Sequence, residues 1–191
     1  MLTCQSMSQP AVTYQWLYDG EVLSDTSTLS VPDITRSSAG VYTCIVTNVI
    51  GSLSINSTVI VQYAPSNTIS TPSWVPHQTD HTITCSFDSV PTPSIVWSIN
   101  DTTITSGSGG YTIQNGDSES LLIITNLSPS HQGDYKCEVT NLLGSSSDTA
   151  NLIVQVPPDP PTGLTVDDTE ERSIDISWAV SYTHLTLPTK A

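Results

Sequence analysis

Basic residues are scarce in this sequence: four lysines and arginines stand against eighteen aspartates and glutamates, for a formal net charge of −14 at pH 7. Nucleic acid, heparin and anionic membranes are each bound through a basic face, so the charge balance excludes them as partners. Charged residues of both signs make up only 12% of the chain. Because the acidic residues are spread along its length, they indicate a soluble extracellular surface rather than an acidic site.

Long apolar runs and paired cysteine motifs are also missing. No stretch of about 18 apolar residues occurs, so no transmembrane helix is predicted. The absence of a Cys-x-x-Cys pair argues against a zinc ribbon and against a thioredoxin-type motif. The four histidines have no metal-ligand spacing with one another or with the cysteines; they are His77, His81, His131 and His184. We therefore predict no metal site.

The sequence has no recognisable catalytic motif either. No Gly-x-Ser-x-Gly elbow is present, and no set of acid, base and nucleophile can be assembled from the residue spacing. The glycine-rich segment 107–110 is followed by neither a lysine nor a helix pattern, so it predicts a turn between strands rather than a phosphate loop. We predict no catalytic residue, no cofactor and no enzymatic activity.

Cysteine is used sparingly but in an even number. Cys4, Cys44, Cys85 and Cys137 stand at long spacings, which favours structural disulfides and therefore an oxidising compartment. No export signal stands between Met1 and the first cysteine. We therefore expect the sequence to be a fragment of a larger extracellular protein whose start is missing.

The chain contains an internal repeat. Residues 10–16 (PAVTYQW) align with residues 91–97 (PTPSIVW) at an offset of 81, as do the cysteines upstream of them. Farther along the offset becomes 93, where residues 40–44 (GVYTC) align with residues 133–137 (GDYKC). The change of offset means that the second copy has twelve extra residues between its tryptophan and its next apolar strand.

Each copy shows the two-residue periodicity of β-strands. Leu122 and Ile124 share one face of their segment, and the residues between them point the other way. No segment has helical periodicity of useful length. Strands with one apolar face bury that face against a second sheet, so we predict an all-β fold of two-sheet sandwiches.

The repeated pattern Cys…Trp…Cys, with a tyrosine two residues before the second cysteine, resembles the immunoglobulin fold, a Greek-key β-sandwich. The resemblance assigns residues to three strands: Cys4 and Cys85 to strand B, Trp16 and Trp97 to strand C, and Cys44 and Cys137 to strand F. It implies one disulfide in each copy, Cys4–Cys44 and Cys85–Cys137, with no pairing between the copies. The matching distance from cysteine to tryptophan in both copies motivates the same assignment.

The same resemblance implies a tyrosine corner in each copy, formed by Tyr42 and Tyr135. The tyrosine hydroxyl would bond the backbone upstream, where the bend needs a hydrogen-bond partner. The family usually has an acidic residue four positions before this tyrosine, but Ser38 and His131 stand there. The salt bridge usual at the base of the sandwich is therefore not expected in either copy.

The two copies differ after their tryptophans. The first copy (1–63) has one short segment there, residues 21–25, which resembles the compact C2-type sandwich, and it begins at strand B without strand A. The second copy (64–156) has room for two more strands at 102–105 and 111–114, which resembles the I-type set found in adhesion proteins. We expect the first domain to be poorly stable alone, because the missing strand leaves an exposed edge.

Residues 156–161 (VPPDPP) predict a stiff, extended linker after the second copy. The segment 157–180 resembles the start of a fibronectin type III domain, with strands at 164–166 and 174–178. Two strands cannot close a core, so we do not expect this part to fold by itself. Residues 181–191 resemble translated sequencing-adaptor readthrough, which predicts a non-native tail; the alternative is a divergent linker.

Three Asn-x-Ser/Thr sequons, at Asn56, Asn100 and Asn126, fall on positions that are expected to point outward. Asn56 alternates with inward residues, Asn100 follows strand C, and Asn126 stands beside inward positions. We expect N-glycosylation at one or more of them. Pro129 directly follows the third sequon and disfavours its use.

Immunoglobulin domains ahead of a fibronectin type III domain resemble contactins, neural cell-adhesion molecules and receptor tyrosine phosphatases. The resemblance implies a non-catalytic protein-binding module of a cell-surface adhesion or receptor ectodomain. Its partners would be other cell-surface or matrix proteins, homophilic ones included, and membrane attachment would come only through missing segments. Two alternatives stay open: structural spacer domains of an intracellular titin-like muscle protein, and the ectodomain of a receptor tyrosine phosphatase or kinase. Paired cysteines, sequons and scarce lysine favour the extracellular reading over the titin-like one.

Overall fold

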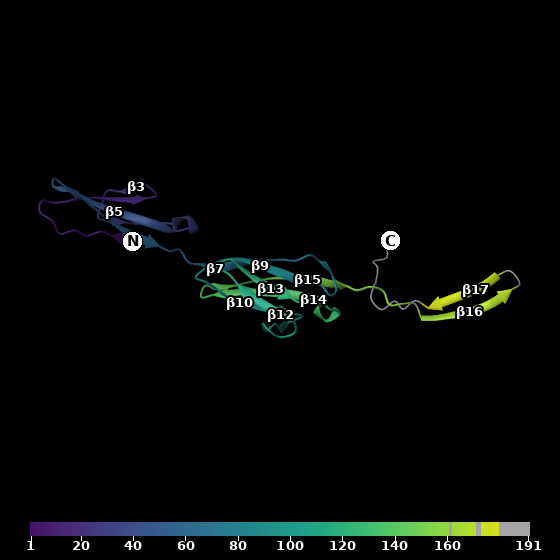
Figure 1. Cartoon of the computed structure of the whole chain (residues 1–191). Helices are drawn as coiled ribbons and strands as arrows, with labels where there is room; N and C mark the ends of the chain where they lie inside the picture. Colours follow the sequence, from purple (N-terminus) through teal and green to yellow (C-terminus); the bar gives the residue numbers. More distant parts are fainter. Residues whose placement is uncertain (161, 171–172, 180–191) are drawn as a thin grey trace.

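The computed structural model describes residues 1–160, 162–170 and 173–179 of the chain. They form two β-sandwich repeats followed by a two-stranded hairpin, which succeed one another along the chain in Figure 1. The prediction of an all-β fold with tandem sandwiches is confirmed. Within the described ranges, no helix is long and apolar enough to cross a membrane.

The first repeat has two sheets of unequal size. One has four strands in the order β3-β2-β5-β6, and the other pairs only β1 with β4. The elements are β1 (Leu2–Thr3), β2 (Thr13–Tyr18), β3 (Glu21–Ser24), β4 (Thr28–Leu29), the 3-10 helix η1 (Arg36–Ser38), β5 (Gly40–Asn48) and β6 (Gly51–Val59). In the described structure, β6 and β1 each have one unpaired side.

The second repeat has fuller counterparts of both sheets. One sheet has the order β11-β10-β14-β15-β8, and the other has the order β12-β13-β9-β7. The elements are β7 (Tyr63–Ser70), β8 (Trp74–Pro76), β9 (His81–Val90), β10 (Ser94–Ile99), β11 (Thr102–Thr103), β12 (Tyr111–Asn115), β13 (Glu119–Ile124), the 3-10 helix η2 (Pro129–His131), β14 (Gly133–Asn141) and β15 (Gly144–Gln155). β11 occupies the same edge of its sheet as β3 does in the first repeat, so of the two extra strands expected only β12, at the edge of the second sheet, has no counterpart in the first repeat.

The two cores differ in size because their second sheets differ. In the second repeat, Leu122 and Ile124 on β13 are fully buried, as their two-residue alternation predicts. The first repeat has only two short strands in its second sheet, so fewer residues are covered. Its buried core consists of Cys4, Trp16, Leu29, Tyr42 and Cys44.

The last described part is an antiparallel hairpin of β16 (Thr162–Glu170) and β17 (Ser173–Ala179). The strands expected at 164–166 and 174–178 fall within it. Residue 161 of the linker and the expected tail at 181–191 lie outside the described residues.

Candidate functional site

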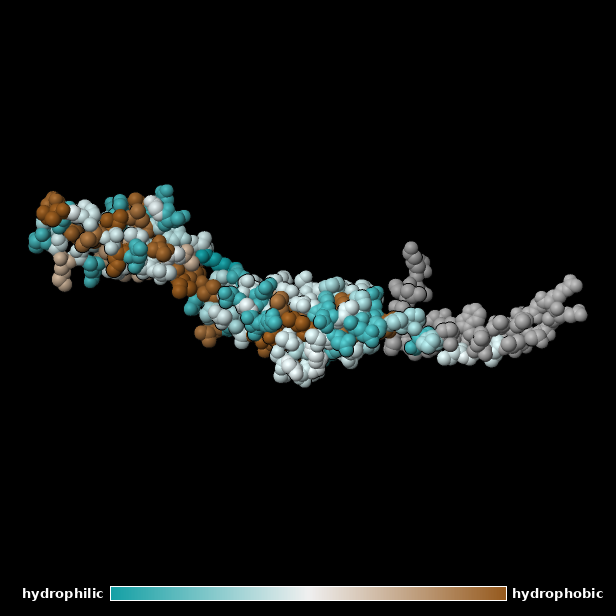
Figure 2. Space-filling model, viewed as in Figure 1, coloured by the Kyte–Doolittle hydropathy of each residue, from teal (hydrophilic) through white to brown (hydrophobic). Residues whose placement is uncertain are grey.

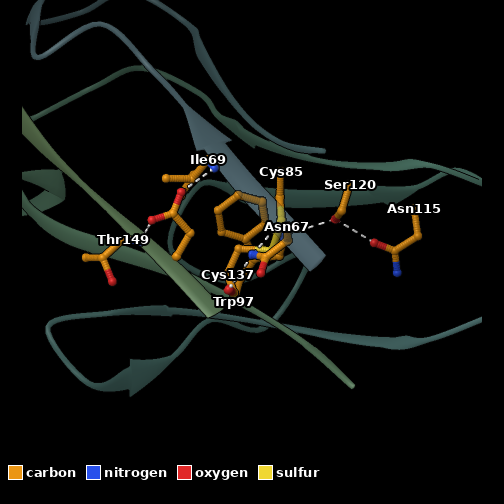
Figure 3. The surroundings of a disulfide bond; sticks show 9 residues. Asn67, Ile69, Cys85, Trp97, Asn115, Ser120, Cys137 and Thr149 are labelled. Carbon is orange, nitrogen blue, oxygen red and sulfur yellow. Dashed lines mark hydrogen bonds between the residues drawn. A yellow bond between two sulfur atoms is a disulfide. The ribbon is translucent and has the colours of Figure 1, made fainter. Parts of the chain in front are cut away.

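Each repeat carries one disulfide. Cys4 is bonded to Cys44 and Cys85 to Cys137, each with a Cα–Cα distance of 6.4 Å. Trp97 lies beside the second bridge (Figure 3), stands opposite Cys137 in the β10–β14 register and is 1% exposed. The disulfide Cys85–Cys137 and the core residue Trp97, which the sequence pattern grouped together, therefore lie side by side in the structure.

A buried hydrogen-bond chain holds Trp97. Its indole Nε1 donates to Ser120 Oγ at 2.9 Å, and that hydroxyl donates to Asn115 Oδ1 at 2.7 Å. An unpaired buried donor costs about 1–3 kcal/mol, so the serine hydroxyl is needed here. The indole Nε1 of Trp16 is also buried, yet it has no hydrogen-bond partner among the described residues. Sequence reasoning missed Ser120, because nothing distinguishes it from the many other serines.

Both tyrosine corners are present. The Tyr42 hydroxyl donates to the backbone oxygen of Ser38 at 3.1 Å, and the Tyr135 hydroxyl donates to that of His131 at 2.7 Å. Burial, followed by a hydrogen bond to Tyr111, raises the pKa of Tyr135 far above its usual range. The hydroxyl of Tyr135 therefore stays protonated and acts as a donor.

Ser38 and His131, which stand where the family has an acid, cap the turns that precede the corners. The backbone N–H of Thr35 donates to Ser38 Oγ at 3.1 Å, and that of Ser128 donates to His131 Nδ1 at 3.0 Å. These two contacts close the 3-10 helices η1 and η2. Neither residue forms an ion pair in the part of the chain that the structure describes.

The three sequon asparagines are all exposed, but their surroundings differ. Asn56 Oδ1 accepts a hydrogen bond from Thr43 Oγ1 at 3.0 Å. Asn100 Oδ1 accepts the backbone N–H of Asp134 at 3.0 Å, which holds its amide against β14. The side chain of Asn126 has no hydrogen-bond partner among the described residues, which makes it the least constrained of the three.

Metal-binding side chains do not gather anywhere in residues 1–160, 162–170 and 173–179. His81 is half-buried with Nε2 2.7 Å from Thr71 Oγ1, and burial lowers its pKa. His131 Nε2 lies 3.0 Å from the backbone oxygen of Gly109. Both side chains thus have structural partners, and His184 lies outside the described residues.

The outer face of β10, β14 and β15 is rich in hydroxyl groups. The register places Val96 opposite Glu138, with Lys136 beside them on the same face. The hydroxyl-bearing residues of this face are Ser94, Ser98, Thr140, Ser145, Ser147 and Thr149. Lys136 Nζ lies 3.3 Å from Glu138 Oε2, so the cation of this face is paired. This face therefore presents hydroxyl groups, one exposed valine and a charge pair that is satisfied within the face.

A cluster of three side chains joins the two repeats. Arg36 Nη1 on η1 lies 2.6 Å from Asp88 Oδ2 on β9, and the Tyr63 hydroxyl donates to Asp88 Oδ1 at 2.6 Å. The guanidinium carbon of Arg36 stands 3.8 Å from the centroid of the Tyr63 ring. The hydrogen bond to Asp88 raises the pKa of Tyr63. The sequence analysis did not identify this contact between the domains. The one available signal was that Arg36 is among only four basic residues in the chain.

Two family models match the repeats. Residues 67–154 match the model of the immunoglobulin I-set domain, and residues 1–61 match an immunoglobulin domain model. Both repeats are immunoglobulin domains. The I-set match covers the domain that contains β11 and β12.

Relatives extend the similarity beyond the two immunoglobulin domains. The chain is 30% identical to contactin-1 of Bos taurus over 94% of its own length, and 29% identical to contactin-4 of Rattus norvegicus over 93%. It spans only 19% of the length of either relative.

Solved structures show the same fold. A crystal structure of Dpr2 Ig1-Ig2 in complex with DIP-Theta Ig1-Ig3 gives a TM-score of 0.69 at 23% identity, covering 81% of this chain and 58% of that one. A titin A168169 structure gives 0.61 at 19% identity, covering 78% and 87%. At these identities the likeness concerns the fold alone.

Replacing Arg36 with methionine is expected to loosen the joint between the immunoglobulin domains, because it removes both the ion pair and the stacking on Tyr63. An exposed ion pair contributes about 0–1 kcal/mol and a cation–π contact about 0.5–1 kcal/mol, so thermal stability should change little. The distance distribution from small-angle X-ray scattering should broaden instead. Lys136→Met is the matched control, since it removes the same charge from a pair within one domain. Identical distributions for the two variants would contradict this role of Arg36.

Proposed function

We propose that this chain is a non-catalytic protein-binding module in the ectodomain of a cell-surface adhesion molecule or receptor. The observation that carries the proposal is the similarity to contactins over 94% of the chain, through both immunoglobulin domains and past them. Two disulfides and no free cysteine in the described residues fit an oxidising, extracellular location.

The proposal includes the domain limits 1–63, 64–156 and 157–180, with the last segment as the start of a fibronectin type III domain. The antiparallel pairing of β16 with β17 supports that assignment, because such a domain begins with strands at these places. N-glycans on one or more of the three sequons fit the same location. We assign the greatest accessibility to Asn126, whose amide is unconstrained.

The outer face of β10, β14 and β15 in the second domain is the proposed contact surface. It combines hydroxyl groups with one exposed apolar side chain, Val96, and its one charge pair is internal. A face of mixed polarity forms modest, wet interfaces, so the affinity of a single domain would be weak. Tandem modules overcome weak affinity by raising the effective concentration of the next contact.

We infer a different protein, rather than a second copy, as the partner. A chain with a formal net charge of −14 repels its own copies when like-charged faces approach. A partner with a more basic surface would meet no such repulsion and would associate faster at low salt.

The test uses beads coated with the full chain, produced in a secretory host and displayed on a multimeric carrier. The beads should adhere to cells that display a partner and should not clump with one another at physiological salt. Val96→Arg should abolish adhesion, because a charge would stand at the centre of the contact face. Val41→Arg on β5 is the matched control, since the two valines are 47% and 48% exposed.

Three results would count against the proposal. Strong bead-to-bead clumping would replace the heterophilic partner with a homophilic one. Equal adhesion by the Val96 and Val41 variants would contradict the assignment of the contact surface to the second domain. Hydrolase or transferase activity in the purified chain would overturn the non-catalytic assignment.

The alternative, a structural spacer of an intracellular titin-like protein, is supported by the shared fold with titin domains. It predicts that the cysteines of the native protein are reduced and that no glycan is attached. Paired cysteines in both domains favour the extracellular module.

A further inference from the structure

The sheet that β2, β3, β5 and β6 form in the first domain carries a row of side chains across its outer face. In the strand register Leu17 stands opposite Thr43, and Thr43 stands opposite Asn56. Val22 on β3 stands opposite Leu17 and continues the row. Cys44, the residue after Thr43, belongs to the buried core, so the row points away from the core. The row therefore crosses all four strands, from Val22 at one edge to Asn56 at the other.

Apolar side chains lie in and beside this row. Val41 and Ile45 stand two residues before and after Thr43 on β5, so they share its face. Val22 is 56% exposed and Val41 is 48% exposed. All outward positions of the described strands β2, β5 and β6 hold uncharged residues, although the chain has a formal net charge of −14. Figure 2 shows more hydrophobic surface on the first domain than on the second. Contiguous exposed apolar side chains mark a surface that contacts another molecule or group.

The second domain has the same row on its own outer face, but there the row is polar throughout. It consists of Thr103, Ser98, Lys136 and Thr149. At the offset of 93, Asp134 and Glu138 take the places of Val41 and Ile45. The four strands that carry the row are present in both domains. The difference therefore lies in the side chains of this face and not in its strands.

Asn56, at the β6 end of the row, is also the asparagine of a sequon. Its Oδ1 accepts the hydrogen bond from Thr43 Oγ1 at 3.0 Å, which holds the carboxamide beside β5. Its Nδ2 donates no hydrogen bond among the described residues. The residue at this place in the second domain is Thr149, which cannot carry an N-glycan. The domain with an attachment site on this face is thus the domain whose face is apolar.

The other two sequons have different surroundings. The backbone N–H of Asn126 donates to Asp80 Oδ1 at 2.9 Å, so a carboxylate lies beside that site. Asn100 Nδ2 lies against Gly133, because a Cβ added to this glycine would be 2.5 Å from it. Among the three, Asn56 is the sequon that stands in an uncharged, partly apolar row.

The chemistry of an N-glycan suits such a row. The rings of its first sugars, N-acetylglucosamine, present C–H groups on their faces and hydroxyl groups at their edges. The faces can bury apolar side chains, which is favourable in water. Gln15 and Ser54 stand on either side of Ile45 in the next row and offer hydrogen-bond partners to the edges. The row spans three strand spacings of about 4.8 Å each, which leaves room for several sugars.

We propose that an N-glycan on Asn56 lies across the outer face of the first domain and covers its apolar side chains. Attachment forms a bond from sugar C1 to Asn56 Nδ2 and breaks the C1–O bond of a lipid-linked diphosphate oligosaccharide. The lipid diphosphate and one Nδ2 proton leave. The proposal rests on the extracellular location given under the proposed function, because the secretory pathway supplies this donor. It assigns different tasks to the two equivalent faces: the first is covered by sugar, and the second is left free for a protein partner.

The test uses the full chain secreted from a eukaryotic host, with occupancy measured by mass spectrometry of glycopeptides. Hydroxyl-radical footprinting then reports the accessibility of individual side chains. Thr58→Ala removes the sequon and keeps Asn56, and Thr58 is exposed, so the variant keeps its fold. Oxidation of Val22 and Val41 should rise severalfold in the variant, because the sugars no longer cover them. Val96 of the second domain, which is 47% exposed, is the internal control and should not change.

A second variant tests the packing without removing the glycan. Val41→Asp combined with Ile45→Glu gives the face the charges of the second domain. Asn56 should stay occupied, but its glycan should shift from oligomannose toward complex forms, because sugars released from the face become accessible to processing enzymes. Thr47→Ala is the matched control, since Thr47 is an exposed residue of the same face outside the sequon. Its glycan composition should equal that of the unsubstituted chain.

Three results would overturn the proposal. The first is an unmodified Asn56 in the secreted chain. The second is equal oxidation of Val22 and Val41 with and without the sequon, which would mean that the glycan extends into solvent. The third is protection of these valines in Thr58→Ala that grows with chain concentration, which would assign the face to contact between copies. Adhesion through the second domain does not need this glycan, so the bead assay and this test fail independently.

Discussion

Replacing Cys85 and Cys137 together with alanine is expected to lower the free energy of unfolding of the second domain by about 4 kcal/mol. The bridge closes a loop with a sequence separation of 52, and in the chain-entropy model such a loop restricts the unfolded ensemble by about that amount. Trp97, the largest fully buried side chain, packs beside the bridge. Removing the two sulfur atoms therefore also removes packing contacts around Trp97. Denaturant unfolding, with hydrogen exchange across β9 and β10 to identify the domain, measures the change.

The matched control is the Cys4→Ala, Cys44→Ala variant. Its loop has a sequence separation of 40, so the expected loss is nearly the same size, but exchange should accelerate across β2 and β5 instead. A loss below about 1 kcal/mol in the second domain would contradict the staple role of its bridge. Peptide mapping under non-reducing conditions that joined Cys44 to Cys85 would overturn the pairing itself.

Most of the fold could be predicted from the internal repeat. A cysteine, a tryptophan and a Tyr-x-Cys pair recur at matched positions, because each performs a packing task that both domains share. The twelve extra residues predicted two extra strands; β12 is one of them, whereas β11 is the counterpart of β3 in the first domain. Alternation predicted which residues of β13 are buried, because β-strand side chains point to opposite faces in turn.

The contacts that differ between the domains could not be predicted in this way. Ser120 accepts a hydrogen bond from the indole of Trp97, whereas the indole Nε1 of Trp16 has no hydrogen-bond partner among the described residues, and no spacing rule separates one serine from another. The joint of Arg36 with Asp88 connects residues far apart in sequence, and their pairing depends on how the domains meet. The short 3-10 helices were also absent from the prediction, since one turn leaves no periodicity.

The inner face of β6 in the first domain, where Leu53 and Ile55 are 77% and 68% exposed, shows a limit of a different kind. Sequence reasoning expected an exposed edge, because the domain begins at strand B. It did not indicate that Leu53 and Ile55 would lie on the uncovered inner face, since that depends on the register of β6 against β5. An apolar residue at an inward position looks the same in a sequence whether or not a strand covers it.

Replacing Gly133 with alanine is expected to destabilise the second domain by about 2 kcal/mol, through backbone strain and a steric clash. Gly133 has a φ of +155°, a conformation that L-residues with a side chain rarely adopt. An added Cβ would lie 2.5 Å from Nδ2 and 2.6 Å from Oδ1 of Asn100. Moving Asn100 aside would break its hydrogen bond with the backbone N–H of Asp134, so no small shift relieves the contact.

Gly116→Ala is the matched control, because an added Cβ there would come no closer than 3.4 Å to any other atom and the backbone is not left-handed. Its expected effect lies within about 0.5 kcal/mol. The double variant Asn100→Ala, Gly133→Ala should recover the part of the loss that comes from the clash and retain the part that comes from φ. Equal stability of the Gly133 and Gly116 variants would contradict the argument. Gly40 of the first domain, with a φ of +149° and Tyr18 Cε2 2.8 Å from its added Cβ, should respond in the same way. In the first domain the last residue of β2 stands against the glycine that opens β5, and in the second domain the residue just after β10 stands against the glycine that opens β14.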